Sequence, residues 1–416
     1  MTSVAALGDS DTRLKWAVRV AVAICADVPG AAPPVPISVG PSAPTPKQLS
    51  SIGLEVDVEH LDDDEWGDRL AEFDVVVVCS LMFRLNGVLE RVREVERAGR
   101  RRPLVVTGYA GVVYEGHEMG ALWRSGADVV VCNSRRDHRR FGEVYDEFGL
   151  DPAVLVRGGL GVLPRDRPPA EVLATAAAPS PERDGPIVFA VQPDVPRSRE
   201  ERLALLRRWV EYADRWPDRQ VVVKLRSRPG EQTTHPEPHH YETLAGTHLA
   251  EVPANLEFRY GVMEGVLDGA RALATVSSTA AMEALAMGVP TVILADFGVQ
   301  DRYGTRFFLR SGLMRTVEQV IDDDIGSPRP EWLADNGFHP DDTLDHVARR
   351  VAELLDADPP PPPRFFEERR TPFMIDQARE RLGAAGAPPT ARHRVRSLLN
   401  GPLRQLYLRV DGWLRR

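Results

Sequence analysis

Short apolar runs alternate with longer stretches of helical spacing, and this alternation constrains the fold of the chain more than any other feature. Each run ends in polar residues or glycine, which is the pattern of parallel strands joined by crossover helices. The predicted strands of the first half are residues 4–7, 56–59, 75–79, 104–107 and 129–132. Those of the second half are residues 187–191, 220–225, 273–276 and 291–294.

The chain of 416 residues is longer than one hydrophobic core usually spans, so the two sets of strands predict two domains. We expect an α/β fold of two Rossmann-like, doubly wound domains that face a cleft. Residues 163–185 are rich in Pro, Ala, Arg and Glu and have no strand pattern, which places the boundary near residue 170. The predicted N-terminal domain covers residues 1–170 and the C-terminal domain covers residues 171–355.

Prolines mark two further segments. Five consecutive prolines at residues 359–363 exclude a helix, so residues 356–416 are predicted to form a proline-rich crossover followed by a separate helical tail. Six prolines among small residues at 31–46 predict a mobile surface loop that could lie over the cleft.

The composition excludes several classes of protein. A net charge of −9 gives no general attraction to nucleic acid. No apolar run reaches eighteen residues, and the first residues lack the pattern of a signal peptide. The three cysteines lie in or beside apolar runs without metal-ligand spacing, so we expect reduced thiols and a cytoplasmic protein.

A strand-to-helix turn in the second half is the main candidate site. Residues 272–276 have the pattern of a buried strand and residues 280–287 that of a helix, so the turn between them consists of Ser277, Ser278 and Thr279. Unpaired N–H groups and the helix dipole could hold a phosphate there, although a plain N-cap is the alternative. Glu283 lies one turn further on the same face, where it either accepts from ribose hydroxyls or caps the helix.

Basic residues follow a second strand of this half. Lys224 ends the apolar run at 220–225, and Arg226 and Arg228 would share its face if the strand continued. At the carboxyl end of a strand these cations could bind an anion, whereas solvated surface charge is the alternative. Glu231 could orient the arginines, and His235 could donate to a phosphate or base or have no role.

Asp296 follows the predicted strand at 291–294 and is a further candidate contact of the donor. The tripeptide Asp296-Phe-Gly298 does not indicate a protein kinase, because no glycine-rich loop, strand lysine or catalytic-loop motif accompanies it. Its position on a loop at the carboxyl edge of the sheet is what makes it a candidate.

The first half offers candidates for the second substrate. Asp9 and Asp11 follow the first strand and begin a helix, so either carboxylate could deprotonate an acceptor hydroxyl, or simply cap the helix. Gly108 and Tyr109 lie on a second edge loop, where glycine permits close approach of an acceptor, although a structural loop is the alternative.

These motifs together resemble a known family. The residues Val221-Val-Val-Lys224, Asn255-Leu256 and the segment 274–290 resemble the donor domain of GT-B glycosyltransferases. Within that fold the chain especially resembles a group of uncharacterised actinobacterial sequences that look like glycosyltransferases and are distantly similar to capsule polysaccharide, polysialic acid and CDP-glycerol polymer transferases. The resemblance covers roughly residues 1–320, since Asp9-Ser-Asp-Thr-Arg-Leu-Lys-Trp16 and the segment 124–128 look similar as well.

The resemblance implies that the Ser277–Thr279 turn holds the donor phosphate and that transfer needs no metal ion and no cofactor. In those transferases a His-Pro pair normally follows the lysine-bearing strand. Here Arg226-Ser-Arg228 follows Lys224, and His235-Pro236 comes only later. This departure implies that the arginines supply the positive charge in place of a histidine.

The last residues of the chain form a basic amphipathic segment. Residues 392–416 contain seven arginines and one acid, beside leucines at near-helical spacing. Such a helix could pack back on the domains, or adsorb to anionic lipid at the inner face of the plasma membrane.

The sequence therefore predicts a metal-independent glycosyltransferase. It would move a sugar from a nucleotide-sugar donor to a hydroxyl of a glycan or lipid-linked acceptor of the cell envelope. A nucleotide-sugar epimerase of the same fold and a non-catalytic nucleotide-sugar binding protein are the alternatives.

Overall fold

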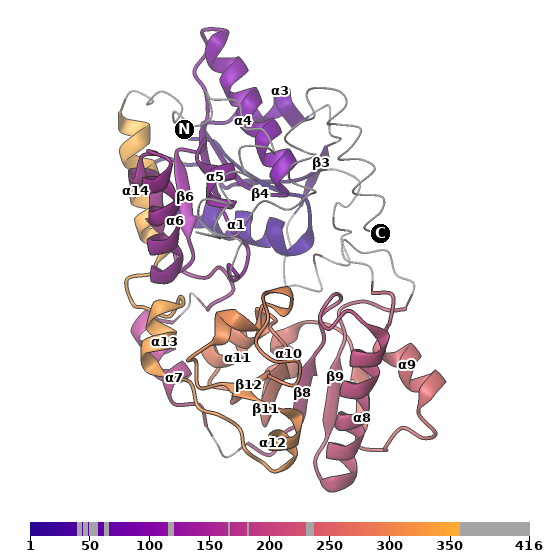
Figure 1. Cartoon of the computed structure of the whole chain (residues 1–416). Helices are drawn as coiled ribbons and strands as arrows, with labels where there is room; N and C mark the ends of the chain where they lie inside the picture. Colours follow the sequence, from indigo (N-terminus) through magenta and orange to yellow (C-terminus); the bar gives the residue numbers. More distant parts are fainter. Residues whose placement is uncertain are drawn as a thin grey trace, which may run out of the picture.

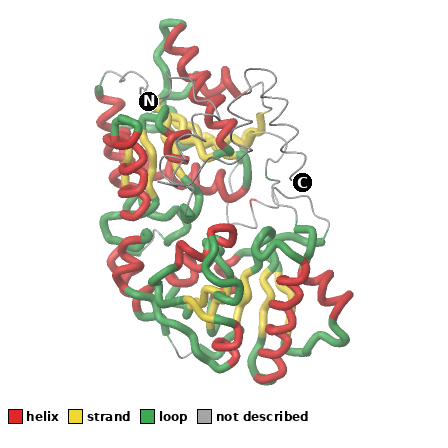
Figure 2. Tube along the Cα trace, in the orientation of Figure 1, coloured by secondary structure: helices red, strands yellow, loops and turns green. Residues whose placement is uncertain are grey.

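The computed structural model describes residues 1–39, 44, 49, 57–61, 66–114, 120–164, 167–180, 183–229 and 237–357. Two parallel β-sheets, each flanked by helices, lie one above the other in Figures 1 and 2. The prediction of two doubly wound α/β domains is thus confirmed. The predicted tail at 392–416 lies outside the described residues, as do Glu231 and His235.

The N-terminal sheet has seven strands in the order β3-β2-β1-β4-β5-β6-β7. All its pairings are parallel, and the strand order reverses between β1 and β4. Its strands are β1 (Val4–Gly8), β2 (Val35–Val39), β3 (Glu59–Leu61), β4 (Val75–Cys79), β5 (Leu104–Gly108), β6 (Val129–Cys132) and β7 (Leu155–Arg157).

The C-terminal sheet has six parallel strands in the order β10-β9-β8-β11-β12-β13, and this order reverses between β8 and β11. Its strands are β8 (Ile187–Ala190), β9 (Val221–Lys224), β10 (Leu256–Arg259), β11 (Ala272–Thr275), β12 (Thr291–Leu294) and β13 (Met314–Arg315). In open α/β sheets a ligand typically binds beyond the carboxyl ends of the strands beside such a reversal.

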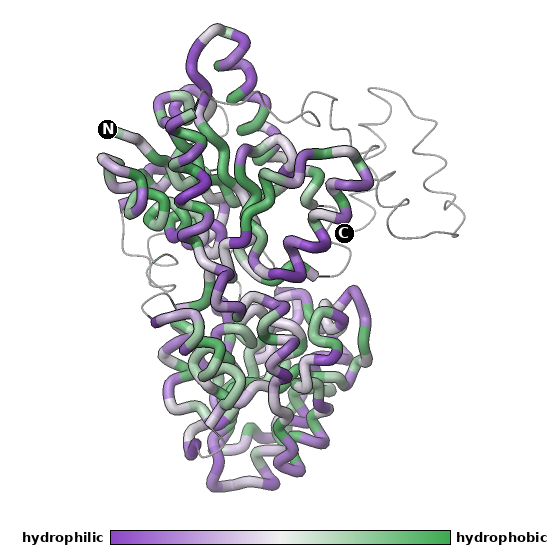
Figure 3. The backbone as a smooth tube through the Cα atoms, turned by 90° about the vertical axis from the view of Figure 1, so that its left-hand side faces the viewer, coloured by the Kyte–Doolittle hydropathy of each residue, from purple (hydrophilic) through white to green (hydrophobic). Residues whose placement is uncertain are grey.

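Helices cover both faces of the N-terminal sheet, because successive strand residues point to opposite faces. Val76 and Val78 pack with one set of helices, and Val75 and Val77 with the other. The first set comprises α3 (Trp66–Leu70), α4 (Met82–Arg97), α5 (Gly120–Arg124) and α6 (Arg135–Glu147), and the second comprises α1 (Asp11–Asp27) and α14 (Leu344–Asp356). Figure 3 shows the hydrophobic segments inside and hydrophilic segments outside.

The C-terminal sheet is covered in the same way. Val188 packs against one layer of helices and Ile187 against the other. The first layer contains α7 (Pro169–Ala177), α10 (Met263–Leu267), α11 (Ala280–Ala286) and α13 (Pro330–Asp335), and the second contains α8 (Arg199–Arg215), α9 (Tyr241–His248) and α12 (Val317–Ile321). None of the helices within the described ranges is long and apolar enough to cross a membrane.

The prediction of a mobile loop at 31–46 is wrong for residues 35–39, because these residues form strand β2. This strand lies between β1 and β3, and Pro36 is paired with Ala6 inside the sheet. Prolines near this strand predicted a loop, yet Ile37 and Val39 are fully buried in the core. A proline in a parallel strand removes one ladder hydrogen bond, and burial of the alternate apolar side chains offsets that loss.

The chain returns to the N-terminal domain after it has completed the second sheet. Helix α14 packs along α1, where Val347 and Val351 join the core formed by Leu14 and Val18. In Figure 1 this helix stands beside the N-terminal sheet although it ends the described chain. The predicted division at 171–355 assigned these residues to the second domain, whereas their buried side chains lie in the first.

Candidate functional site

The carboxyl edges of the two sheets face each other, and side chains from both edges meet. Arg226, which follows β9, donates to the carboxylate of Asp11 at the start of α1, with an N–O distance of 3.0 Å. Tyr114, which follows β5, donates its hydroxyl to the carbonyl oxygen of Ser277 at 2.6 Å. The candidate site therefore lies at a contact between the two domains.

The turn between β11 and α11 forms where the sequence predicts it. The amide of Gln192, which follows β8, accepts from the N–H of Ser277 at 2.9 Å and donates to its hydroxyl at 3.2 Å. The hydroxyl of Ser278 accepts from the N–H of Ala280 at 3.2 Å, a local bond that fixes the turn before α11. Gln192 thus orients the turn from the neighbouring strand, at the point where the strand order reverses.

Thr279 completes the turn and touches the other domain. A side chain at Gly111 would come within 2.8 Å of the Thr279 hydroxyl oxygen, so the glycine permits this close approach. Burial raises the pKa of the neighbouring Tyr114 to about 12, so its hydroxyl stays a donor throughout the physiological range. The loop at 111–114 therefore packs directly on the predicted phosphate-binding turn.

Lys224 is a buried cation at the carboxyl end of β9. Its ammonium donates to the carbonyl oxygen of Leu225 at 2.8 Å. Burial, opposed by the attraction of Glu283 and assisted by the repulsion of Arg226, lowers the pKa of Lys224 to about 8. A charged lysine that is this well buried is unfavourable without an anion, so it marks a candidate binding site.

Glu283 connects this lysine to the other domain. Burial raises the pKa of its carboxyl group, while the charges of Lys15, Arg19 and Lys224 oppose that rise and Glu264 adds to it. Lys15 and Arg19 lie one helical turn apart on α1, and Arg19 donates to the carbonyl oxygen of Gly161. Three cations from two domains thus surround one carboxylate.

The two aspartates that follow β1 have different surroundings. The Asp9 carboxylate is buried and accepts from Arg13 at 2.7 Å, from the N–H of Leu81 at 2.8 Å and from Arg84 at 3.4 Å. Asp11 is only partly buried and faces the C-terminal domain through Arg226. Asp9 ties α1 to α4 across the strand reversal, and Asp11 lies at the domain contact.

Two of the remaining donor-side candidates have partners within the C-terminal domain. Arg228 lies over the ring of Tyr260 at 4.8 Å. Asp296 accepts from the N–H of Val317 at 3.1 and 3.2 Å, at the first turn of α12. Burial raises the pKa of Asp296, and its hydrogen bond to Val317 opposes that rise. Asp296 therefore helps to hold the start of α12.

Gly108 and Tyr109 lie against the interior of the N-terminal domain. The carbonyl oxygen of Gly108 accepts from Arg124 at 3.2 Å, and this guanidinium lies 3.7 Å from the centre of the Tyr109 ring. The Tyr109 ring also packs against Phe141. These contacts fix the end of β5 and thereby position the loop at 111–114.

Gly108→Ala is expected to lower the free energy of unfolding by about 2 kcal/mol, because the added methyl group overpacks the core. Its Cβ would lie 2.6 Å from the buried ring of Trp16 and 3.1 Å from Val131. Urea unfolding measures the effect. Gly142→Ala is the matched control, because a Cβ there meets no atom within 4 Å and should leave stability unchanged or slightly higher. Equal stability of both variants would refute the packing role of Gly108.

Sequence reasoning missed four residues of this site: Lys15, Arg19, Gln192 and Glu264. Lys15 and Arg19 carry a detectable signal, since two cations four residues apart interrupt the apolar pattern of α1. Gln192 follows a predicted strand directly, which is the position that drew attention to Ser277. Glu264 is an exposed residue of a short helix and carries no comparable signal.

Comparison with known proteins gives one family and a set of related folds. The model of a family described as "Putative glycosyltransferase (DUF6716)" matches residues 4–354. No curated protein sequence matches the chain. The family match covers both sheets and nearly all of α14.

Solved structures share the architecture at low sequence identity. UDP-GlcNAc 2-epimerase from Methanocaldococcus jannaschii has a TM-score of 0.55 at 12% identity, covering 86% of this chain and 100% of that chain. The S. aureus MnaA-UDP co-structure has a TM-score of 0.54 at 10% identity, covering 86% and 96%. A protein from Listeria monocytogenes described as a "putative UDP-N-acetylglucosamine 2-epimerase" has a TM-score of 0.52 at 14% identity, covering 86% and 98%. These similarities establish the GT-B fold.

Proposed function

The chain belongs to the family described as "Putative glycosyltransferase (DUF6716)", and we propose that it transfers a sugar from a nucleotide-activated donor to an acceptor hydroxyl. The acceptor that we propose is a glycan or lipid-linked molecule of the cell envelope. That part rests on the sequence resemblance to capsule-type polymer transferases and on the basic tail at 392–416.

The observation that carries the proposal is the buried ammonium of Lys224, which lies at the same sheet edge as the Ser277–Thr279 turn. Both lie at carboxyl ends of strands in one sheet, on either side of the central strand β8. A diphosphate would compensate the buried charge of Lys224 and accept from the hydroxyls of the turn. The S. aureus structure of the same fold contains UDP, so uridine diphosphate is the first nucleotide to test.

Each remaining candidate has a proposed role. Glu283 accepts from the ribose hydroxyls, Arg226 neutralises donor phosphate, and Asp11 deprotonates the acceptor hydroxyl. The Asp9 carboxylate is buried and already accepts from two arginines and a backbone N–H, so we assign the base to Asp11. Binding of the donor requires separation of the Arg226–Asp11 contact, and closure afterwards excludes water from the site.

Thermal-shift measurements against UDP-, GDP-, CMP- and CDP-linked sugars test the donor site. A ligand that binds only the folded state raises the melting temperature by mass action. We expect one of these donors to stabilise the protein and Ser278→Ala to reduce that stabilisation. No stabilisation by any of the four classes would contradict the proposed function.

An epimerase of the same fold is the second candidate, favoured by the description of two of the compared structures as UDP-N-acetylglucosamine 2-epimerases. An epimerase converts a free nucleotide-sugar without an acceptor, whereas a transferase needs one. A non-catalytic binding protein would bind the donor and release no nucleotide. Analysis of the products formed from the donor, with and without acceptor, separates the transferase, the epimerase and the binding protein.

Donor binding is expected to weaken as the pH rises above about 8. Lys224 has a pKa of about 8, so its ammonium attracts phosphate below this pH and is lost above it. The dissociation constant should rise up to tenfold per pH unit above 8. Isothermal titration between pH 6 and pH 10 measures the profile, and Lys224→Arg should flatten it because a guanidinium stays charged. A profile that is flat in the wild-type protein would exclude Lys224 as a phosphate ligand.

A further inference from the structure

Arg202 of α8 is a fully buried arginine whose side chain has no exposed surface. It makes five hydrogen bonds, which equals the number of N–H donors in a guanidinium. One bond goes to the carboxylate of Glu237, whose side chain is 4% exposed. The other four go to backbone carbonyl oxygens, which belong to Gln192, Pro193, Pro196 and His239. No donor is left for a substrate, so the role of Arg202 lies in the segments that it joins.

The first of these segments follows β8 and contains Gln192. Gln192 and Val195 form an isolated antiparallel bridge, so the chain turns tightly here. Arg202 donates to the carbonyl oxygens of Gln192 at 2.6 Å and of Pro196 at 2.8 Å, at the two ends of that turn. A carbonyl group inside the fold is unfavourable without a donor, so the path of residues 192–196 depends on the guanidinium.

The second segment follows β9 and anchors the guanidinium. The carboxylate of Glu237 neutralises the charge of Arg202, so this arginine adds little net attraction for a donor phosphate. Nearby His240 is buried, and its Nε2 donates to the carbonyl oxygen of Ser227 at 2.9 Å. Arg202 thus ties the segment after β8 to the segment after β9, the strand that carries Lys224.

Gln192 connects Arg202 to the proposed donor site. Its backbone carbonyl accepts from Arg202, while its side-chain amide accepts from the N–H of Ser277 at 2.9 Å and donates to the Ser277 hydroxyl at 3.2 Å. Hydrogen bonds weaken steeply when their distance or angle changes, so a shift of about 1 Å in the Gln192 backbone would break at least one of them. The orientation of Ser277 therefore depends on where Arg202 holds the chain.

We propose that Arg202 is a positioning residue of the donor site. It fixes the backbone of Gln192, and Gln192 holds the Ser277–Thr279 turn in the orientation that binds the donor phosphate. Arg202 itself touches no substrate, and its effect on donor binding is transmitted through Gln192. This role rests on the proposed function, because it concerns how the same phosphate-binding turn is held.

Hydrogen exchange of the ligand-free Arg202→Lys protein tests the positioning role. Lysine keeps the positive charge beside Glu237 but has one nitrogen with three donors, so it cannot replace five bonds to two segments. We expect the N–H of Ser277 to exchange at least tenfold faster than in the wild type, because its acceptor Gln192 is displaced. Glu237→Gln removes the charged acceptor of the guanidinium and should give the same pattern at smaller size, so the test does not depend on the folding of one variant.

Titration with uridine diphosphate extends the test to the donor site. Arg202→Lys should raise the dissociation constant of UDP about tenfold. In a Gln192→Ala background the same substitution should raise it less than about twofold further, because the connection to the turn is already lost. A wild-type protein that does not bind UDP would count against the donor site, whereas the exchange measurement would still decide the role of Arg202.

Asn255→Ala is the matched control. The Asn255 amide also donates to backbone carbonyl oxygens of the C-terminal domain, but it precedes β10 and thus lies at the amino edge of the sheet. This variant should leave both the exchange of Ser277 and the affinity for UDP unchanged. An Arg202→Lys protein in which Ser277 exchanges as in the control, or a loss of UDP affinity that adds in full to that of Gln192→Ala, would overturn the proposal.

Discussion

Replacement of Lys224 by methionine is expected to weaken donor binding at least a hundredfold, about 3 kcal/mol, while the protein becomes no less stable. The loss of affinity follows from the removal of a buried charge that would pair with the donor diphosphate. The folded state should be no less stable because position 224 is buried, where an uncharged side chain is favourable. A methionine fills a similar space and needs no counter-ion.

The sign of the stability change comes from the lowered pKa of Lys224, about 8 in the folded protein against an ordinary 10.5. Below pH 8 the lysine is charged in both states, and burial makes that charge less favourable in the folded one. This cost is complete below pH 8 and disappears as the pH rises from 8 to 10.5. Lys224→Met removes the cost, so the free energy of unfolding at pH 7 should rise by about 2 kcal/mol.

Urea unfolding at pH 7 and titration with the stabilising donor provide the two measurements. Arg207→Met serves as the control, because it removes an exposed positive charge and should change neither quantity appreciably. A Lys224→Met protein that still binds donor as the wild type does would remove Lys224 from the site. A large loss of stability would instead show that Lys224 has a structural role in the folded protein.

Asp11→Asn should reduce the rate of sugar transfer by a factor of about 10² to 10⁴, because an amide cannot accept the acceptor proton. Donor affinity should stay the same or rise, because the ion pair with Arg226 that donor binding breaks is weakened. Asp9→Asn should instead lower the free energy of unfolding by about 3 kcal/mol. The Asp9 carboxylate is buried between Arg13 and Arg84, and neutralising it leaves their charges uncompensated.

Steady-state kinetics for Asp11→Asn and urea unfolding for both variants separate the two aspartates, each serving as the control for the other. The reverse result, a stable and inactive Asp9→Asn protein beside an active Asp11→Asn protein, would move the catalytic base to Asp9. This distinction was open in the sequence, where both aspartates begin the same helix.

The sequence predicted the fold well where a strand is continuously apolar. The five residues Val75–Cys79 are all buried, and such a run predicts a strand buried on both faces. Strand β2 was missed because Pro36 lies within it, and β13 because a two-residue edge strand has no periodicity. The packing of α14 on α1 was also missed, since an amphipathic helix does not specify its partner.

The sequence predicted which polar residues lie at the facing edges of the two sheets, because each closely follows a buried strand. Arg226, Asp11 and Ser277 follow strands and lie at the domain contact for this reason. Asp296 and Gly108 also follow strands, yet their atoms stabilise a helix start and a packed ring. Spacing along the chain shows which edge a residue occupies, whereas its hydrogen-bonding partner depends on tertiary packing.

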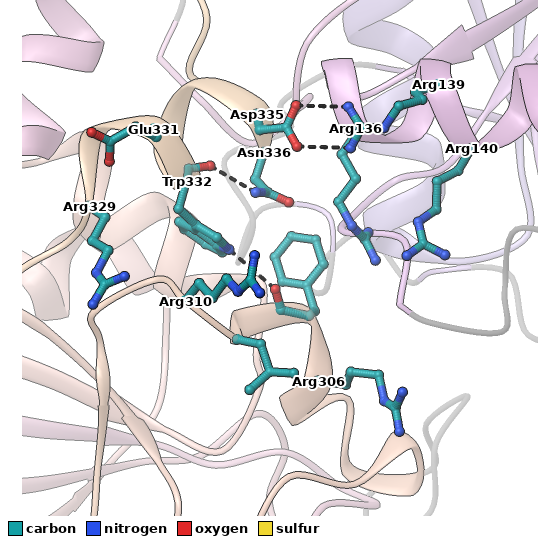
Figure 4. Close-up of a pocket in the computed structure, with 12 residues that line it drawn as sticks. Arg136, Arg139, Arg140, Arg306, Arg310, Arg329, Glu331, Trp332, Asp335 and Asn336 are labelled. Atoms are coloured by element: carbon teal, nitrogen blue, oxygen red, sulfur yellow. Dashed lines mark hydrogen bonds and ion pairs between the residues drawn. The ribbon is translucent and has the colours of Figure 1, made fainter.

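A cavity of about 640 Å³ lies between the two domains, and the arginines that line it had no counterpart in the sequence analysis (Figure 4). Its six arginines come from segments up to 193 residues apart, from Arg136 to Arg329, and each looks like ordinary surface charge in the chain. Only the approach of α6 to α13 brings them together, as the cross-domain pair of Arg139 and Asp335 shows.

Product analysis of the stabilising nucleotide-sugar distinguishes sugar transfer from epimerisation. The protein is incubated with this donor, first alone and then with extracted envelope glycans and lipids, and sugar configuration and free nucleotide are measured by NMR and chromatography. A glycosyltransferase should leave the sugar configuration unchanged without acceptor, and release nucleotide with glycosylated product when acceptor is present. Conversion of the free donor to its epimer, with no dependence on acceptor, would contradict sugar transfer.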